Sequence, residues 1–495
     1  MNLPPEYLMI LTMVVPLGAV FGIVAANRYP NFREGVTLTA SLVLIFLVAR
    51  LYGITSSGIE VAWSGIQILP DLAIYFRIEP LGMLFSLIAG FLWFITSIYS
   101  IGYMRGHHEK NQTRFYVCFA IAISSVMGIS YAGNLFTLFI FYEVLTLSTY
   151  PLVTHAGTDK AKLGGRVYLG ILLSTSILFL LLGVIGTWYV AGTLDFKPGG
   201  VFNESQVMAA AVLLPLFIFG IGKAAIMPFH RWLPAAMVAP TPVSALLHAV
   251  AVVKAGVFSV LKVCTYIFGF DLLQELPTAD FLIYLAGASV IIASLVAMKQ
   301  DNLKARLAYS TVSQLSYITV GALLANEAGA LGGAMHIGMH AFGKITLFFC
   351  AGAIMVASHK TEISDMHGLG RKMPITMTAF FIGALSIIGL PPCGGTWSKW
   401  YLMIGTIEAE KWILMIVLMA SSLLNIAYLL PIPIKAFLYE PADGKEQTGG
   451  MQEAPLPVLI ALCMSALGCV VLFLYPQPLF ELATSFVEAT GFNGR

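Results

Sequence analysis

The stretch Pro215-Leu-Phe-Ile-Phe-Gly-Ile-Gly-Lys223-Ala-Ala-Ile-Met-Pro228 decides the fold class of this chain. It is apolar apart from one lysine, and no acid nearby in the sequence neutralises that charge. A charge is costly in hydrocarbon, so an ionisable residue inside a membrane span usually marks an ion or proton path. The feature recurs in other long apolar runs, at Lys254, Lys344 and Lys399, and a lone acid, Glu143, lies in a further one.

The composition of the whole chain is that of a membrane protein. Of its 495 residues, 58% are hydrophobic and 11% are charged, which is far more apolar than a soluble domain. A helix of roughly 20 apolar residues crosses a bilayer. We therefore expect an all-α polytopic membrane protein with about fourteen transmembrane helices, each built on one such segment. The expected segments are Glu6–Ala26, Gly35–Leu51, Pro80–Tyr99, Phe115–Tyr131, Asn134–Val153, Val167–Val190, Val207–Pro228, Val243–Phe268, Phe281–Ala297, Leu303–Leu323, Ala328–Ala357, Ile375–Trp400, Trp412–Phe437 and Pro455–Leu474.

Two of these segments combine helix-breaking prolines with a lysine, at Gly220–Pro234 and Gly389–Trp400. Proline removes a backbone donor and clashes with the preceding turn, so both helices should unwind there. Broken helices in corresponding places indicate an inverted repeat in transporters. We predict two inverted five-helix repeats, each with a broken helix. The expected units are N-terminal transmembrane helices at 1–114, a first repeat at 115–268, a second repeat at 281–437, and a C-terminal loop with the last helix at 438–495.

Basic residues in the loops predict the orientation of the chain. Loops on one side carry seventeen lysines and arginines, and loops on the other side carry five. By the positive-inside rule the richer loops are cytoplasmic, which places both termini outside the cell inner (plasma) membrane and requires an even number of spans. The first segment lacks a basic flank and contains Glu6, so we expect a retained span rather than a signal peptide. The six cysteines lack Cys-x-x-Cys pairs, which favours buried apolar roles over a metal site.

The buried ionisable residues fall into groups that suit proton transfer. Glu143 and Lys223 form a candidate acid/base pair. Lys254 follows His248 by six residues, a rise of about 9 Å along a helix. Each has a structural alternative, namely an ion pair between helices, a lysine that reaches toward the headgroups, or an ordinary hydrogen bond. Lys262, further along the same segment, is interpreted as an interface lysine.

A second group lies on one helix stripe. His336, His340 and Lys344 are spaced at i, i+4 and i+8, in steps of about 6 Å. Histidine changes charge near neutral pH and so suits a proton carrier. The His-x-x-x-His spacing also fits a metal, but no third ligand accompanies it and the lysine repels a cation, so we expect no metal. We also expect no cofactor, because the chain has neither a cysteine cluster nor a Gly-rich nucleotide loop.

Four motifs within these segments are long and specific. They are Asn134-Leu-Phe-Thr-Leu-Phe-Ile-Phe-Tyr-Glu143, Lys223 before Pro228-Phe-His-Arg-Trp-Leu-Pro234, Ala239-Pro-Thr-Pro-Val-Ser-Ala-Leu-Leu-His248, and Asp301-Asn-Leu-Lys-Ala-Arg-Leu-Ala-Tyr-Ser-Thr-Val-Ser-Gln314. Together they strongly resemble the antiporter-like membrane subunits of respiratory complex I and of Mrp multisubunit cation/proton antiporters, over residues 115–437. The resemblance implies that Lys344 is the central residue of the second half and Lys399 the terminal one.

Details of the sequence favour one branch of that superfamily. The segment Gly389-Leu-Pro-Pro-Cys-Gly-Gly-Thr-Trp-Ser-Lys399 has lysine where one complex I subunit type carries glutamate. The short C-terminus lacks the long lateral helix of other types, and Asn425-Ile-Ala-Tyr-Leu-Leu-Pro-Ile resembles the Mrp D protein. The resemblance therefore implies a non-enzymatic transport subunit of the Mrp D type. The alternative is a proton-pumping subunit of complex I or of a hydrogenase-type redox complex.

The hypothesis is that charge separation controls proton transfer. At about 4 Å and an effective dielectric near 20, Glu143 and Lys223 attract by about 4 kcal/mol. Separating the pair releases the lysine proton toward His248 or Lys254, then to the stripe of His336, His340 and Lys344, and finally to Lys399. Hard cations prefer several oxygen ligands, so we expect any Na⁺ or K⁺ path to run through partner subunits. Expected partners are other membrane subunits, homologous antiporter-like ones included, and the lipid bilayer, but no nucleic acid. A third hypothesis is that the chain is a scaffold, in which the buried charges only hold the helices together.

Overall fold

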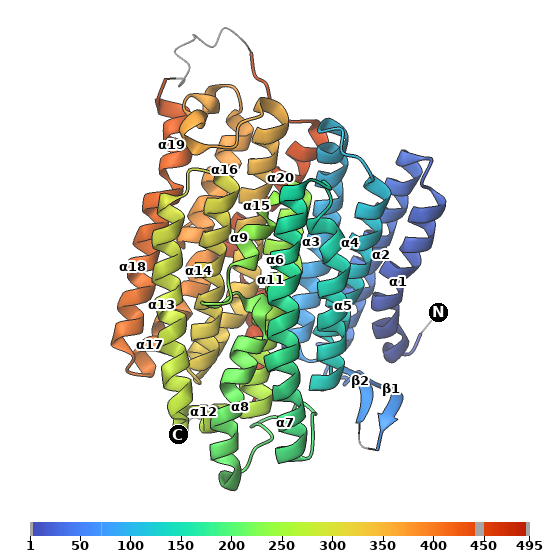
Figure 1. The fold of residues 1–495 in the computed structure, drawn as a ribbon, viewed down its shortest axis with the longest axis vertical. Coiled ribbons are helices and arrows are strands. Elements are labelled where there is room, and N and C mark those ends of the chain that lie inside the picture. The colour runs from blue at the N-terminus through green and yellow to red at the C-terminus, as the bar shows by residue number, and fades with distance from the viewer. Residues whose placement is uncertain (1–2, 71, 441–449, 492–495) are drawn as a thin grey trace.

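The protein is a bundle of long helices that run in nearly the same direction (Figure 1). The computed structural model describes residues 3–70, 72–440 and 450–491, apart from the side chains of residues 247 and 248. Each of the expected segments coincides with a helix or with an interrupted helix. The first half of the chain contains α1 (Pro5–Ala25), α2 (Pro30–Thr55), β1 (Ala62–Leu69), β2 (Leu72–Arg77), α3 (Pro80–Gly106), α4 (Gln112–Ser130), α5 (Leu135–Val153), α6 (Asp159–Thr175), α7 (Leu181–Ala191), α8 (Val207–Gly220), α9 (Trp232–Ala235), α10 (Thr241–Ala245) and α11 (Val252–Val263).

The second half is helical throughout its ordered elements. They are α12 (Phe270–Glu275), α13 (Pro277–Lys299), α14 (Leu303–Leu323), α15 (Glu327–Ser358), α16 (Pro374–Ile388), α17 (Gly395–Glu408), α18 (Trp412–Leu429), α19 (Pro431–Leu438), α20 (Leu456–Leu474) and α21 (Gln477–Glu488). Short π-helical turns continue α6 into α7 at Ser176–Leu180, connect α10 to α11 at Leu246–Val250, and extend α11 at Cys264–Phe268.

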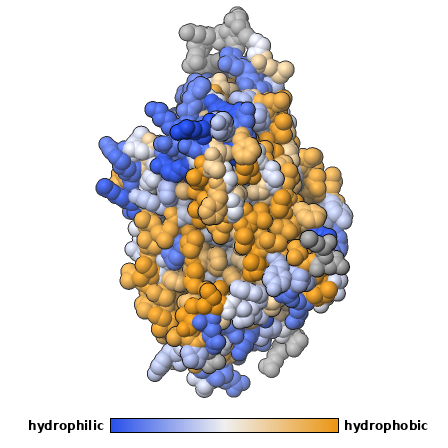
Figure 2. Space-filling view, turned by 90° about the vertical axis from the view of Figure 1, so that its right-hand side faces the viewer, coloured by the Kyte–Doolittle hydropathy of each residue, from blue (hydrophilic) through white to orange (hydrophobic). Residues whose placement is uncertain are grey.

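The lengths and surfaces of these helices match a bilayer. Within the described residues, ten helices are long and apolar enough to cross a membrane. The other expected spans are α14 and three interrupted ones, α8 with α9, α10 with α11, and α16 with α17. On the face shown in Figure 2, hydrophobic side chains cover the middle of the molecule and hydrophilic side chains gather toward its two ends. The chain is an all-α polytopic membrane protein, as its composition predicts.

Both predicted helix breaks are present. The helix α8 ends at Gly220, a 3₁₀ turn follows at Gly222–Ala224, and Ala225 takes the left-handed conformation with φ 55°. The helix α16 ends at Ile388, and the next residue, Gly389, has φ 89°, a conformation that an L side chain rarely adopts. Each break lies in the fourth span of its expected five-span unit and carries a lysine at or just after the interruption.

The helix α11 lies in the centre of the bundle, where all twelve of its residues are buried. Gly256 allows it to approach the first break. A Cβ atom on Gly256 would lie 2.3 Å from the carbonyl carbon of Lys223 and from the nitrogen of Ala224. Because that space is filled by backbone, α11 can take this position only with glycine at the contact.

Two elements differ from the sequence expectation. The stretch 52–79, expected as a loop, contains the antiparallel pair β1 and β2, in which Ala62 faces Arg77 and Trp63 faces Phe76. Contacts with the turn between α4 and α5 stabilise this hairpin, since Arg77 N donates to Tyr131 O and Gly133 N donates to Tyr75 O. The helix α21 follows the last expected span.

All six cysteines are free, and five are buried as expected, whereas Cys463 is exposed.

Candidate proton-transfer site

Lys223 is completely buried at the first helix break and is held by α5. Its Nζ donates to the main-chain oxygen of Tyr142 at 2.8 Å and to Thr146 Oγ1 at 2.5 Å. The same nitrogen lies 3.1 Å from the centroid of the Tyr142 ring. Desolvated cation–π contacts of this kind are worth about 2 kcal/mol. The ammonium group is therefore stabilised by an aromatic ring and by neutral oxygens.

Glu143 is close to Lys223 but separate from it in this structure. The carboxylate attracts the lysine electrostatically, yet the two side chains make no ion pair within 4.0 Å in the described part of the chain. Both carboxylate oxygens are buried without a hydrogen-bond donor among the described residues. Neighbouring side chains of α5, Val144 and Leu147, are exposed, so Glu143 lies near the outer surface of the bundle. The arrangement corresponds to the separated state of the expected pair.

The strongest direct link between candidate residues joins α11 to α15. The ammonium group of Lys254 contacts Nδ1 of His340, and both side chains are buried. The His340 ring is stacked on that of His336, with centroids 5.6 Å apart and an interplanar angle of 25°. The i, i+4 spacing predicts this stacking. The partner of Lys254 on the stripe is thus its middle residue.

From His336 the contacts continue to the second helix break. His336 Nδ1 lies 2.9 Å from Ser398 Oγ, and its ring is stacked on Tyr317 at 5.8 Å. Lys399 Nζ lies 4.8 Å from the centroid of the same tyrosine ring. It donates to Ile388 O at 3.0 Å and to Ser422 Oγ at 3.1 Å. Since Ile388 ends α16, the ammonium group also interacts favourably with the negative end of that helix dipole.

Lys344 lies at the other end of the stripe and contacts α14. Its Nζ donates to Ser310 Oγ at 2.6 Å and to Leu307 O at 3.2 Å. The hydroxyl of Tyr428 donates to Ser310 Oγ at 2.9 Å. The histidine stripe therefore has two arms, one toward Lys399 and one toward Lys344. Sequence spacing predicts the stripe but not this branching, which depends on where α11, α14 and α17 pack against α15.

Direct contacts and stacked rings join three of the eight predicted residues, Lys254, His340 and His336, and the Tyr317 ring connects His336 with Lys399. Lys344 contacts α14 instead, and Glu143 interacts with Lys223 through its charge. The side chain of His248 lies outside the described residues. Lys223 and Lys254 make no direct hydrogen bond to each other. Several polar residues that hold the relay were not predicted, namely Tyr142, Thr146, Ser310, Tyr317, Ser398 and Ser422. The sequence offers a signal for two of these six residues, since Tyr142 directly precedes Glu143 and Ser398 directly precedes Lys399.

Glu143 is not the only buried acid near the predicted spans. Glu79, immediately before α3, is buried and lies 2.9 Å from Lys262, which has no exposed surface. Lys262 is therefore an interior lysine rather than the expected interface lysine. Glu34 on α2 is also buried and binds Arg105. Sequence hydropathy missed both acids because each lies at or near the end of an apolar segment.

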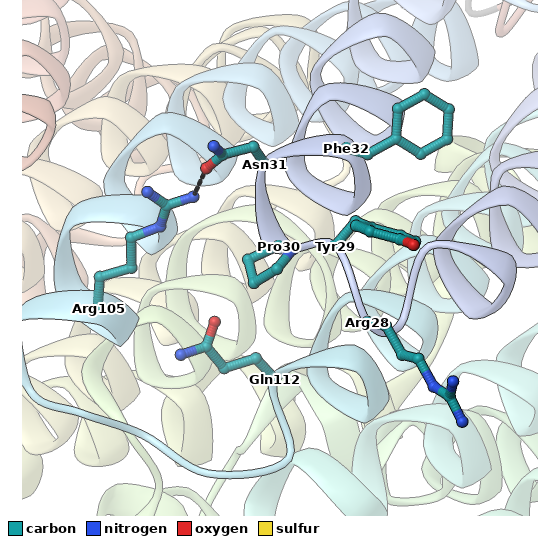
Figure 3. Close-up of a pocket in the computed structure, with 7 residues that line it drawn as sticks. All are labelled: Arg28, Tyr29, Pro30, Asn31, Phe32, Arg105 and Gln112. Atoms are coloured by element: carbon teal, nitrogen blue, oxygen red, sulfur yellow. Dashed lines mark hydrogen bonds between the residues drawn. The ribbon is translucent and has the colours of Figure 1, made fainter.

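A surface cavity of about 890 Å³ lies apart from all these residues, at the connection of α1 and α2 with the end of α3 and the start of α4. Figure 3 shows its lining residues, Arg28, Tyr29, Pro30, Asn31, Phe32, Arg105 and Gln112. Arg105 donates to Asn31 Oδ1 across it. Polar contacts between the loops line this cavity, and none of the candidate relay residues is among its lining residues.

Comparisons with known proteins agree with this arrangement. Residues 132–425 match the family described as NADH:quinone oxidoreductase/Mrp antiporter membrane proteins, and residues 66–116 match the N-terminal part of complex I chain 5. The chain is 32% identical to NADH-quinone oxidoreductase subunit N of Desulforudis audaxviator, and the match covers 83% of this chain and 84% of that protein. It is 29% identical to NAD(P)H-quinone oxidoreductase chain 5 of Picosynechococcus, of which it spans 62%.

Two solved structures have the same fold. One is the Mrp complex of Dietzia sp., with a TM-score of 0.86, 22% identity, and coverage of 99% of this chain and 100% of that chain. The other is a membrane-bound sulfane sulfur reductase, an archaeal respiratory complex, with a TM-score of 0.86, 22% identity, and coverage of 98% and 97%. The resemblance seen in the sequence motifs is confirmed. The chain belongs to the NADH:quinone oxidoreductase/Mrp antiporter family of membrane subunits.

Proposed function

We propose that this chain is the proton-translocating subunit of a multisubunit Na⁺/H⁺ antiporter, of the Mrp D type. The observation that carries the proposal is the continuous contact from Lys254 through His340 and His336 to the turn that bears Lys399. Every side chain in it can accept and release a proton or lies within contact distance of one that can.

The first half supplies the control step. In the separated arrangement, Lys223 has lost direct contact with the Glu143 carboxylate and relies on Tyr142 and Thr146. Movement of Glu143 toward Lys223 strengthens the attraction and retains the proton, because Coulomb energy rises as distance falls. Movement away favours release toward Lys254. Glu143 lies near the outer surface of α5, where a neighbouring subunit can change its position.

Water completes the path in this proposal. The amide of Gln314 is fully buried with both polar atoms unpaired among the described residues, as is Nδ2 of Asn425 and Nε2 of His336. Buried polar groups in native proteins are satisfied by protein or by ordered water. These groups lie on α14, α15 and α18, beside both arms of the histidine stripe, where bound water extends the hydrogen-bonded chain.

We assign proton uptake to a cavity at the end that carries the basic loops. It has a volume of about 650 Å³ and opens beside Thr241, the first residue of α10, with Glu109, Lys304 and Lys360 in its wall. From there α10 leads through its π-helical turn to α11 and Lys254. On this assignment the basic side is cytoplasmic and both termini lie outside the inner membrane.

Transport measurements on the assembled complex test the proposal. We expect Glu143→Gln, Lys223→Ala and Lys399→Ala each to abolish proton movement in solid-supported-membrane currents or vesicle pH assays. Wild-type antiport in all three variants ends the proposal. If conservative neutral substitutions reduce assembly but leave transport by the remaining complexes intact, the charges act only as a scaffold.

A second candidate is a proton-pumping subunit of a redox complex. It is favoured by the names of the curated relatives, which are quinone oxidoreductase subunits N and 5. The two candidates share every relay residue and differ in their partners. Mass spectrometry of the intact detergent-extracted assembly separates them. Small membrane subunits and homologous antiporter-like subunits support the antiporter, whereas iron–sulfur and flavin proteins support the redox complex.

A further inference from the structure

A second buried charge pair lies on the same central helix as Lys254. Lys262 is eight residues further along α11, a rise of about 12 Å, and has no exposed surface. Its Nζ lies 2.9 Å from Glu79 Oε2 and donates to Ala132 O at 2.6 Å. The ring of Phe196 covers it, with its centroid 4.4 Å from the nitrogen. None of the steps described above uses this pair.

The pair connects the interior with the surface through Arg77. Glu79 Oε1 accepts from Nε of Arg77 at 3.1 Å and from the terminal NH2 group at 2.6 Å. The Arg77 side chain is 31% exposed, whereas Lys262 is 0% exposed. Glu79 Oε2 faces the lysine without receiving an aligned hydrogen bond. The carboxylate thus binds Arg77 with one oxygen on the solvent side and Lys262 with the other on the inner side.

The pair lies at the end of the bundle opposite the basic loops. Ala132 and Phe196, which surround Lys262, belong to the connections after α4 and after α7. These connections lie at the end of the bundle away from the basic loops. The hydroxyl of Tyr266, one turn after Lys262, is also buried without a hydrogen-bond partner among the described residues and lies within electrostatic reach of Glu79 and Arg77.

A purely structural role is a poor explanation for this arrangement. Desolvation of a buried pair commonly offsets its attraction, and well-packed apolar residues often serve the structure as well or better. An ion pair with a fully buried lysine on one side and a partly exposed arginine on the other connects the interior with solvent, as an exchange site must. Ionisable residues inside membrane proteins usually mark such paths.

We propose that Glu79 and Lys262 form a second proton-carrying pair, which connects the relay with the aqueous compartment opposite the basic loops. This inference rests on the proposed function. The Lys262 ammonium gives a proton to Glu79 Oε2, so that an N–H bond breaks, an O–H bond forms, and both groups become neutral. The neutral carboxyl group, which Arg77 binds less strongly than a carboxylate, then turns its O–H to the Arg77 side, passes the proton to water and becomes a carboxylate again. Neutral Lys262 then takes the next proton from the relay through water along α11.

Arg77 is a positioning residue in this scheme. Arginine cannot be deprotonated in proteins, so it takes no part in the transfer itself. It fixes one oxygen of Glu79 and leaves the other directed at Lys262. Its main-chain nitrogen also donates to Tyr131 O, which ties the end of β2 to the turn after α4.

The decisive variant is Lys262→Arg in the assembled complex. Arginine preserves the positive charge and the ion pair with Glu79 but cannot release a proton. We expect normal assembly, measured by co-purification of the partner subunits, and at least a tenfold lower rate of proton transport in reconstituted vesicles. A rate within twofold of wild type overturns the proposal.

A second set of variants covers the case in which arginine does not fit. Lys262→Met alone leaves the Glu79 charge buried and unpaired, so assembly should fall. The double variant Glu79→Gln with Lys262→Met removes both charges and should restore assembly. We expect its transport to stay at least tenfold low. Recovery of both assembly and transport in the double variant overturns the proposal.

The relay variants separate this inference from the proposed function. If Lys399→Ala abolishes transport while the double variant retains it, only the second pair is excluded. If Lys399→Ala retains transport, the proposed function itself fails. A matched control is Lys162→Met on α6, because that side chain is 59% exposed and its contact with Asp159 lies outside the bundle.

Discussion

The ammonium group of Lys254 on α11 contacts Nδ1 of His340 on α15, and this contact joins the two halves of the candidate relay. Lys254 and His340 belong to different expected repeats, 115–268 and 281–437. In the proposed relay, a proton therefore passes from the first half to the second through a side-chain contact between helices rather than along one helix. The position of α11 against α15 sets how easily that happens.

Loss of this contact should stop transport without loss of the fold. In Lys254→Met the side-chain length is kept and the charge is removed. We expect at least a tenfold decrease in proton transport by vesicles that contain a normal amount of assembled complex. Lys162→Met serves again as the exposed control. Transport above half of the wild-type rate in Lys254→Met would show that the relay bypasses His340.

The ring of Tyr142 should matter more than its hydroxyl. The ring lies 3.1 Å from Lys223 Nζ, and the hydroxyl accepts a hydrogen bond from Lys223 N at 3.1 Å. We expect Tyr142→Leu to lower the stability of the complex by about 3 kcal/mol, because it loses the cation–π contact, about 2 kcal/mol, and the hydrogen bond of the hydroxyl, about 1 kcal/mol. For Tyr142→Phe we expect about 1 kcal/mol, the net worth of the lost hydrogen bond.

Thermal unfolding of the detergent-solubilised complex measures both variants of Tyr142. Tyr189→Leu is the control, since its side chain is 88% exposed. Equal losses in Tyr142→Leu and Tyr142→Phe would contradict the role assigned to the ring.

Gly256→Ala should separate α11 from the first helix break. The added Cβ would lie 2.3 Å from backbone atoms of Lys223 and Ala224, where no flexible side chain can yield. Overpacking of this kind typically costs about 1–3 kcal/mol, so we expect reduced assembly and reduced transport together. Gly170→Ala on α6 is the matched control, because a Cβ there meets nothing within 4 Å. Unchanged assembly in Gly256→Ala would show that α11 is free to move at this contact.

Ser310→Ala tests the arm of the stripe that leads to Lys344. It removes an acceptor for Lys344 Nζ and for the Tyr428 hydroxyl. We expect a loss of about 1 kcal/mol in stability, the net worth of a lost hydrogen bond, because Lys344 keeps Leu307 O and Tyr428 keeps Asn425 Oδ1 as acceptors. We also expect a several-fold decrease in transport. Ser316→Ala, on the same helix, is the control, since that hydroxyl donates to Val312 O of its own helix. Equal behaviour of the two variants would exclude a role for this arm.

The fold could be predicted from the sequence where the signal is local. Apolar length along the chain fixes each span, and the proline pairs fix the two breaks, so α8 and α16 end close to where Pro228 and Pro391 predict. The hairpin of β1 and β2 could not be predicted, because it depends on hydrogen bonds to the distant turn after α4. Its own sequence, Ala62-Trp-Ser-Gly-Ile-Gln-Ile-Leu69, lacks strict alternation of apolar and polar residues.

The candidate site divides in the same way. Spacing on one helix predicts that His336 stacks on His340, and it does. Spacing cannot predict that Lys254 meets His340, that Lys344 meets Ser310, or that Lys262 meets Glu79, because each contact joins helices from different parts of the chain. For the same reason the sequence did not predict that the Lys262 side chain is buried against Glu79, which precedes α3.

The stacking of His336 on His340 limits how many positive charges the two imidazoles can carry at once. Two positive charges 5.6 Å apart repel by about 3 kcal/mol at an effective dielectric near 20. Double occupancy of His336 and His340 is therefore disfavoured by roughly two orders of magnitude. In the proposed relay, the stacked pair therefore holds one proton at a time, and a second proton enters only after the first has left.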